Sequence, residues 1–555
     1  VSLQVFGRLL TAEGFTTVSM SEYRSDGQFR QLVTQSGFFG NSAYSLDLDY
    51  QHNDGTRPNN DLDRIEWYTH VKQQVTEHDT ALLLVKFEDY HSGDNFQYLD
   101  PLARTNGYLP SFRYDEYQQP IVLTGWRHEW SPGFQTLALA GRLENDQQFH
   151  QDGLQFLERV TNKGVPIGLN QPKVNLSYRG QQQIYTGELN QIAEFGSHTL
   201  VLGGRFQGGS LGADYRLTDK PNSALASIFP NEINQNRGFD DGFQSSSLYA
   251  YESWTPLSSL VLTAGIAYVD LRYPANFRHP PLQSDETSVA RTLPKAALVW
   301  TPHASVTLRG IYAKSLGGVG LDESYRLEPS ELAGFSQAFR SLIPESVAGS
   351  VSAPGFDVGG AALDLKLPAR TYLGLRGDFL RSAVDQQTGL FNFDQTKQKG
   401  VTGGTPEHFG FTENVATLTL DKLLGDEWSL GGSYRFQGTQ LDNSYPVLGR
   451  LIQSDVDLHE FGIRVGWTHV SGWFARGDTT WYLQDHKNSN ASFTDGNEDT
   501  CQVDVQVGWR FPGRHGELSG GILNLLDRDY RLDPLSALPE FARERVFFAR
   551  LKLSL

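Results

Sequence analysis

The sequence is poor in sulfur and has no long apolar runs. Its 555 residues include one Cys and one Met. Because Cys501 has no second cysteine to pair with, an internal disulfide framework is excluded. No run approaches the roughly 18 consecutive apolar residues that a membrane helix needs, so a helical membrane protein is excluded too. The thiol-poor composition is compatible with a protein that a bacterium exports.

The sequence also lacks a basic stripe. Its net charge of −17 is dispersed along the chain, with Lys and Arg scattered among the acids. This distribution argues against nucleic acid as a partner. The acidic surplus gathers at 54–63 and 485–499, and we interpret both stretches as solvated loops.

Motifs for chemistry are absent as well. The 14 His form no HExxH and no His/Cys pairing with zinc spacing, and no GxSxG occurs. The acids and amides between 54 and 63 lack the spacing of an EF-hand loop. We therefore expect no catalytic residues, no metal site and no cofactor, and predict that the protein is not an enzyme.

What the sequence has in abundance suits β-strands. It contains 33 Phe, 23 Tyr, 10 Trp and 56 Gly. In the segment 502–511 apolar residues alternate with Asp504, Arg510 and other polar residues, and 372–379, 428–437 and 461–468 repeat the pattern. One face of each segment fits hydrocarbon and the other fits water, which predicts transmembrane strands.

The chain ends on such a strand. Between 546 and 555 the polar face carries Arg550, and the apolar face is formed by Phe547, Leu551, Leu553 and Leu555. A terminal strand without a cap must hide its edge, and pairing with the first strand of a closed barrel does so. We predict that these residues form a C-terminal assembly strand, and that strand-like sequence begins by residues 2–8.

The connections between predicted strands fall into two length classes. Short turns are expected at 131–133, 256–258, 302–304, 424–426, 471–472 and 512–514, and long loops at 93–117, 146–172, 208–242, 317–359, 386–410 and 527–542. Short periplasmic turns opposite long extracellular loops are typical of membrane barrels. At about 25 residues per strand and connection, we predict one all-β domain over 1–555, a transmembrane antiparallel barrel of about 22 strands within a range of 20 to 24.

The alternation of the predicted strands assigns two sets of residues to particular places in the barrel. Tryptophans near the short turns would form a periplasmic aromatic girdle, unless they serve turn chemistry alone; they are Trp130, Trp254, Trp300, Trp467 and Trp509. Charges on the water face would point into the lumen as contacts for a plug or substrate, unless they pair across strands for structure; they are Arg309, Arg376, Asp378, Arg435, Glu460, Arg464, Asp504, Arg510 and Arg550.

A barrel of this size has a lumen too wide for wall side chains to fill, so something should plug it. The long loop at 317–359 has two interpretations. It is long enough to be a displayed binding element, but Leu342, Ile343, Val347 and Val351 could equally fold it inward as a constriction.

Several segments resemble known families. The segment 521–530, Gly-Ile-Leu-Asn-Leu-Leu-Asp-Arg-Asp-Tyr, resembles the close of TonB-dependent receptors, and 306–315 is similar to their barrel strands. The segments 21–27, 53–62 and 327–339 resemble outer-membrane barrels that follow a periplasmic tetratricopeptide array. These resemblances imply a receptor-like barrel integral to the outer membrane of a Gram-negative bacterium.

The sequence departs from that pattern at its start. It begins at Val1 without a signal sequence, plug or energy-coupling box, so we expect a mature protein or a fragment. A plug or repeats would then be missing from this chain, or a separate protein would fill the lumen.

Three functions remain open. The first is a channel for passage, mainly export, of polysaccharide or polypeptide. The second is the barrel of a TonB-dependent uptake receptor without its plug, and the third is surface display. The expected partners are outer-membrane lipid, the barrel-assembly machinery, and a periplasmic plug, repeat-domain or envelope-complex protein.

Overall fold

The computed structural model describes residues 13–98, 109–220, 223–489, 497–536 and 540–555. In these residues one large sheet dominates, and a two-strand hairpin is separate from it. No helix within the described residues is long and apolar enough to span a membrane.

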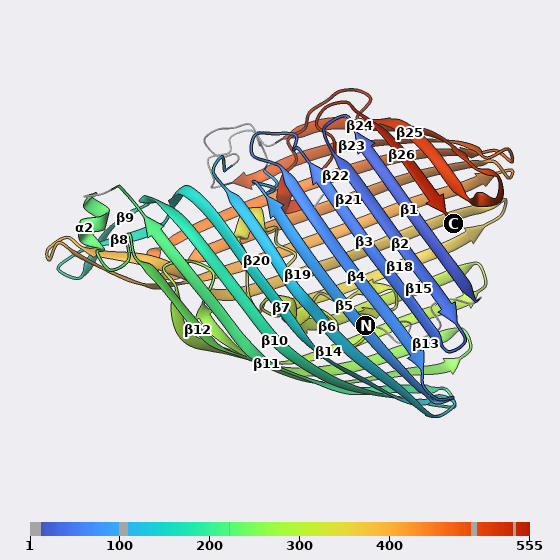
Figure 1. Ribbon diagram of the computed structural model, residues 1–555, viewed down its shortest axis with the longest axis horizontal. Helices are drawn as coiled ribbons and strands as arrows, with labels where there is room; N and C mark the ends of the chain where they lie inside the picture. The colour runs from blue at the N-terminus through green and yellow to red at the C-terminus, as the bar shows by residue number, and fades with distance from the viewer. Residues whose placement is uncertain (1–12, 99–108, 221–222, 490–496, 537–539) are drawn as a thin grey trace.

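The large sheet has 24 strands, of which 22 close into an antiparallel barrel and two, β8 and β9, form an outlying hairpin (Figure 1). The predicted fold class and strand number are therefore confirmed. The first half of the wall consists of β1 (Gly14–Arg24), β2 (Phe29–Phe39), β3 (Ser42–Asn53), β4 (Leu62–Gln74), β5 (Asp79–Ser92), β6 (Arg113–Ser131), β7 (Phe134–Gln155), β10 (Lys173–Phe195), β11 (His198–Thr218), β12 (Asn236–Leu257) and β13 (Leu260–Asn276). The second half consists of β14 (Gln283–His303), β15 (Val306–Leu316), β18 (Gly355–Leu367), β19 (Thr371–Asp394), β20 (Lys399–Leu424), β21 (Trp428–Tyr445), β22 (Arg450–Thr468), β23 (Trp473–Ser489), β24 (Glu498–Arg510), β25 (Gly516–Leu523) and β26 (Val546–Ser554).

The last strand closes the barrel against the first. β26 pairs with β1 in antiparallel register, with Glu22 opposite Arg550, and the two side chains form an ion pair of 2.5 Å. Closure gives both edge strands a partner, as the sequence of β26 predicts. The predicted start at residues 2–8 lies outside the described residues, and β1 begins at Gly14.

One rim has only short connections. The six predicted short turns are all found there, and both ends of the wall, Gly14 and Ser554, lie at the same rim. The turn after β6 is formed by Pro132 and Gly133, and Gly133 has a positive φ of 79° that a residue with a side chain rarely adopts. The predicted division into short and long connections is therefore present.

The other rim differs from the prediction in three places. The loop predicted at 386–410 is wrong, because β19 and β20 continue through it to a turn at 395–398. The loops predicted at 146–172 and 208–242 are shorter than expected, because β7 continues to Gln155 and β11 to Thr218. The error has a physical cause: glycines and polar residues suit loops, yet they also occur in strands that extend above the membrane, where both faces meet water.

Outlying elements pack against these extensions. β8 (Leu157–Asn162) and β9 (Val165–Asn170) form a hairpin, and β8 runs parallel to the end of β19. The short helix α2 (Ala224–Ile228) lies at the same end of the molecule (Figure 1). Phe229 after α2 contacts Phe391 of β19, with ring centroids 4.7 Å apart. An aromatic contact therefore joins the long-loop rim at this point.

The largest hydrophobic cluster lies inside the barrel. On β5, Leu82 and Leu84 are buried while Leu83 between them is 38% exposed, so the first two face the lumen and the third faces outward. Leu123, Leu139 and Ile184 on neighbouring strands belong to the same buried cluster. An apolar inner wall is not expected of a water-filled lumen, so another segment must cover it.

Candidate functional site in the barrel lumen

The covering segment is the connection between β15 and β18, Gly317–Pro354, which we call the lumen loop. It contains a 3-10 turn at Leu321–Glu323, the small hairpin of β16 (Glu331–Leu332) and β17 (Phe335–Ser336), and the helix α3 (Glu345–Ala348). Its ends are held as a hairpin: Gly317 N–H donates to Pro354 O and Ala353 N–H donates to Gly318 O, at 2.7 and 2.8 Å. Between these ends the loop folds into the barrel.

The first half of the lumen loop covers the apolar wall. Val319, Leu327 and Ala353 are buried in the same cluster as the inner leucines of β5–β7, and Leu321 and Tyr325 pack against it. Burial of apolar surface stabilises this contact by about 25 cal/mol per Å². The inner wall and the loop therefore form one continuous apolar interface.

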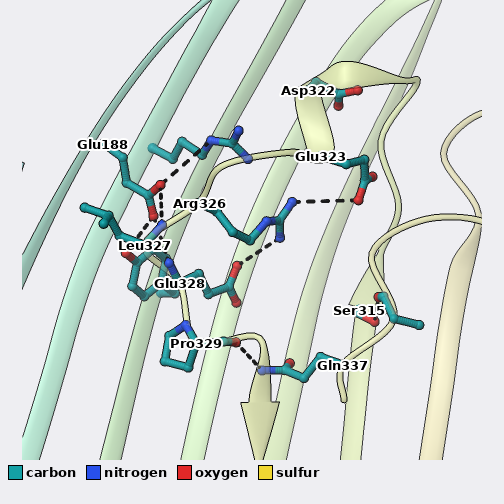
Figure 2. Close-up of polar contacts among 12 residues, drawn as sticks. Glu188, Ser315, Asp322, Glu323, Arg326, Leu327, Glu328, Pro329 and Gln337 are labelled. Atoms are coloured by element: carbon teal, nitrogen blue, oxygen red, sulfur yellow. Dashed lines mark hydrogen bonds and ion pairs between the residues drawn. The ribbon is translucent and has the colours of Figure 1, made fainter. Parts of the chain in front are cut away.

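A buried acid holds the backbone of the loop. Glu188 of β10 accepts hydrogen bonds from the N–H groups of Leu327 and Glu328, at 2.8 and 3.0 Å (Figure 2). Arg205 donates to the carbonyl of Ser324 at 2.9 Å. Hydrogen bonds from a charged group contribute more than neutral ones, so these contacts fix the position of the loop.

A second ionic contact lies next to the first. Lys295 of β14 is buried and its Nζ is 2.7 Å from Oε1 of Glu328, which also accepts a hydrogen bond from Tyr251 at 2.6 Å. Arg326 lies 3.4 Å from the other oxygen of Glu328 and 3.9 Å from Glu323 (Figure 2). Burial acts to raise the pKa of Glu328, but Lys295 and Arg326 together hold that pKa below its usual value.

The turn that precedes Arg326 carries two more buried acids. Burial raises the pKa of Asp322, although its carboxylate accepts hydrogen bonds from the N–H groups of Val319 and Gly320, which act to lower that pKa. Burial also raises the pKa of Glu323 well above its usual range. The docked loop therefore favours a protonated Glu323 and an ionised Glu328.

The β16–β17 hairpin is anchored by an aromatic ring. Phe335 is 1% exposed and lies against Gly360 of β18. The guanidinium groups of Arg376 and Arg309 stack on the ring at 4.5 and 5.9 Å from its centroid. Any side chain at position 360 would take the space of the ring.

The last part of the lumen loop reaches the far side of the lumen. Ile343, Ala348 and Val351 are buried with inner residues of β18–β22. Leu535, from the connection between β25 and β26, joins the same cluster through the 3-10 turn Pro534–Ser536. The lumen loop therefore crosses the barrel and meets a second inward-folded loop.

These contacts favour the constriction over the displayed element. Ile343 and Val351 are buried and Val347 is partly buried, as an inward fold requires, whereas Leu342 is 43% exposed. The segment 327–339, which resembles part of other outer-membrane barrels, contributes the backbone held by Glu188 and the ring of Phe335.

The predicted lumen charges lie in ion pairs across or along the strands. Each of the six arginines has an acid within 3.4 Å: Arg309 with Asp364, Arg376 with Asp378, Arg435 with Glu460, Arg464 with Asp421, Arg510 with Glu517 and Arg550 with Glu22. Asp504 accepts the N–H of Asn524 at 2.8 Å. This geometry favours structural pairing, and contact of these charges with a substrate stays a prediction.

The predicted tryptophans lie on strands next to the short turns. Trp130, Trp254 and Trp300 are 59%, 43% and 42% exposed, while Trp467 and Trp509 are partly buried. Trp509 Nε1 donates to the carbonyl of Ser471 in a turn, at 3.1 Å. Both the girdle and the turn role fit this placement, and the membrane role stays a prediction.

Sequence reasoning missed Glu188, Tyr251, Lys295 and Phe335. The alternation of inward and outward side chains along each strand is the signal that could have indicated them. Lys295, for example, lies on the same face of its strand as the lumen-facing Leu293 and Ala297, and the other face of that strand is apolar. Within the described residues, no group of three or more His, Cys, Asp or Glu could hold a metal ion.

Comparisons place this barrel among known ones. No curated protein matches the chain in sequence. The solved ferric citrate transporter FecA superposes with a TM-score of 0.67 at 12% identity, covering 98% of this chain and 79% of its own. The copper transporter OprC gives 0.64 at 11%, covering 99% and 81%, and the iron transporter FrpB from Neisseria meningitidis gives 0.63 at 10%, covering 98% and 83%. At this identity the likeness shows the fold alone.

The family is shown by sequence. The model of the family described as "TonB dependent receptor-like, beta-barrel" matches residues 49–525, which include most strands of the barrel wall. Members of this family are transporters and not enzymes. With its closed barrel of 22 strands and its terminal strand paired to the first, the chain belongs to the TonB-dependent receptor-like β-barrel family and is an integral protein of the Gram-negative outer membrane.

Proposed function

We propose that the chain is the barrel of a TonB-dependent uptake transporter in which the lumen loop is the gate. The observation that carries this proposal is the lumen loop itself, which is fixed to Glu188 and Lys295 on one side and packs against β18–β22 on the other. The family, together with neighbours named as transporters of copper, ferric citrate and iron, supports uptake better than export.

In this proposal a solute enters from the rim with the long loops. The lumen loop blocks its path at rest and must leave the apolar wall before passage. The paired charges of the remaining inner wall offer a hydrated route, because a polar lining replaces part of the water shell of an ion or chelate. A periplasmic partner would supply the energy for moving the gate, as the family implies.

Excision of the loop tests the gate. Because Gly317 and Gly318 already pair with Pro354 and Ala353, a two-residue Asn-Gly turn can replace 319–352 without breaking the β15–β18 hairpin. In planar bilayers the intact protein should conduct little, and the excised variant should conduct at least several-fold more in steady openings.

A matched control removes a loop outside the lumen. Phe156 N–H donates to Pro172 O at 3.0 Å, so the β8–β9 hairpin between them can be replaced by the same turn. This control should conduct like the intact protein. Equal conductance of the intact and lumen-loop-excised proteins would overturn the proposed gate.

The direction of transport has its own test. Copper or ferric citrate is added to either side of a bilayer that holds the excised barrel in one orientation. For an uptake transporter, one of these solutes should interrupt the current at lower concentration from the long-loop side. Equal block from both sides, or none, would contradict uptake of this solute class.

A further inference from the structure

An apolar groove of about 600 Å³ lies on the outer face of β12–β15. Its floor is made by small residues on adjacent strands: Ala264 of β13 pairs with Ala296 of β14, and Gly310 of β15 pairs with Leu298. Their neighbours Lys295 and Ile311 are buried inside the barrel, so the floor faces outward.

The walls of the groove are large side chains. Leu298 and Tyr312 are 40% and 43% exposed on the same outer face, and Trp254 lies at one end. The volume falls within the roughly 300–1,000 Å³ of sites that bind small molecules. The groove is therefore a defined concavity in a surface that the surrounding lipid covers.

One end of the groove carries a charge. The carboxylate of Glu252 lines it and is half exposed, and Oε1 lies 2.8 Å from Nδ1 of His198. The ring of His198 stacks on Trp254, with centroids 6.1 Å apart. Because His198 directly follows the short turn between β10 and β11, this charged end lies near the short-turn rim.

The β14–β15 end of the groove lies further from the short-turn rim than the β12–β13 end. Glu252, Ala264, Ala296 and Tyr312 form one row of paired residues across β12–β15. Glu252 and Ala264 lie five and four residues from the short turn that joins their strands, whereas Ala296 and Tyr312 lie seven and six residues from theirs, as expected for tilted strands. A ligand in the groove would have its polar end at the periplasmic surface and its apolar end inside the bilayer.

We propose that this groove binds one phospholipid of the periplasmic leaflet, with an acyl chain over Ala264 and Ala296 and a primary ammonium headgroup at Glu252. The location in the outer membrane supplies the lipid, and the apolar floor excludes a polar ligand. The negative charge of Glu252 favours an ammonium group and disfavours an anionic headgroup. The proposal is independent of the gate.

Native mass spectrometry tests the site. The barrel, extracted in mild detergent, is incubated with equal amounts of phosphatidylethanolamine and phosphatidylglycerol. The intact protein should retain one phosphatidylethanolamine. Ala296→Phe fills the floor and should reduce retention at least five-fold, whereas Ala140→Phe, at an exposed position on β7 outside the groove, should not.

The headgroup is tested separately. Glu252→Gln keeps the apolar floor, so lipid should still bind, but the preference for phosphatidylethanolamine should fall to near equality. Heat-modified electrophoresis confirms that each variant is a folded barrel. Retention that is equal in Ala296→Phe and Ala140→Phe, or a preference unchanged in Glu252→Gln, would overturn the proposal.

Discussion

At the scale of single residues, the absence of a side chain at Gly360 leaves room for the ring of Phe335, through which the lumen loop packs against β18. A Cβ at this position would lie 2.7 Å from Cε1 of Phe335 and 3.1 Å from Cβ of Asp378. Gly360→Ala should therefore expel the ring, and losing a buried Phe costs roughly 3–5 kcal/mol in typical cores.

The expected result for Gly360→Ala is frequent channel opening in planar bilayers. Gly432→Ala is the matched control, since a Cβ at that strand glycine would meet no atom within 4 Å. If both variants stay closed, Phe335 is not an anchor of the gate.

Glu323 should make the gate sensitive to pH. Burial raises its pKa in the docked loop, so docking is fully stable below the usual Glu pKa of about 4.3 and is weakened as pH rises through the raised value. Openings should become more frequent from acid to alkaline pH. Glu328, whose pKa is lowered, acts in the opposite direction when pH falls through that value.

The variant Glu323→Gln isolates this contribution. It should reduce the rise in open probability with increasing pH, and a smaller rise should remain because the pKa of Asp322 is raised in the same direction. An unchanged pH profile would show that Glu323 does not titrate during docking.

At the scale of elements, the segment 53–62 holds the connection between β3 and β4 against the connection that follows β5, both at the long-loop rim. Arg57, in the β3–β4 connection, is buried with Asp94 after β5, and the two form an ion pair of 3.2 Å. Arg57 also donates to the carbonyls of Asp94 and Phe96. Asn60, one of the amides in this acid-rich segment, adds a hydrogen bond to Asp94 O at 3.0 Å.

Arg57→Ala should release this junction. It leaves Asp94 as an uncompensated buried charge, which typically costs about 3–5 kcal/mol, so limited proteolysis should cut within 54–112 much faster than in the intact protein. Arg113→Ala removes an exposed pair with Asp61 and should change the cleavage rate little. Equal rates in the two variants would contradict a fastening role.

At the scale of the whole molecule, the closed barrel depends on the pairing of β1 with β26, which we call the seam. The barrel is closed only when β26 pairs with β1, and Arg550 forms an ion pair with Glu22 across this pairing. Arg550→Glu places two acids together in a half-buried site. We expect a lower temperature for conversion to the unfolded form in heat-modified electrophoresis.

The double variant Glu22→Arg/Arg550→Glu should recover much of that loss, because the pair is restored with reversed sign. Arg24 next to Glu22 limits full recovery, since it also contacts that carboxylate at 2.7 Å. A double variant no more stable than Arg550→Glu would mean that charge pairing does not hold the seam.

The sequence by itself determined the barrel. Alternation in 502–511 and 546–555, the two classes of connection and the absence of a membrane helix predicted the closed wall of about 22 strands, because period-2 patterning is a local property of each strand. The same reasoning failed at 386–410, where strand and loop have similar composition above the membrane.

Only the tertiary structure decided that the loop between β15 and β18 folds into the lumen. The apolar residues of 317–359, Ile343 among them, fit both display and constriction, because the choice depends on distant partners and leaves no local pattern. Those partners are Glu188, Lys295 and Gly360, which come from three separate strands. A local pattern indicates which face of a strand is apolar, whereas the position of the lumen loop depends on contacts between segments that only the closed barrel brings together.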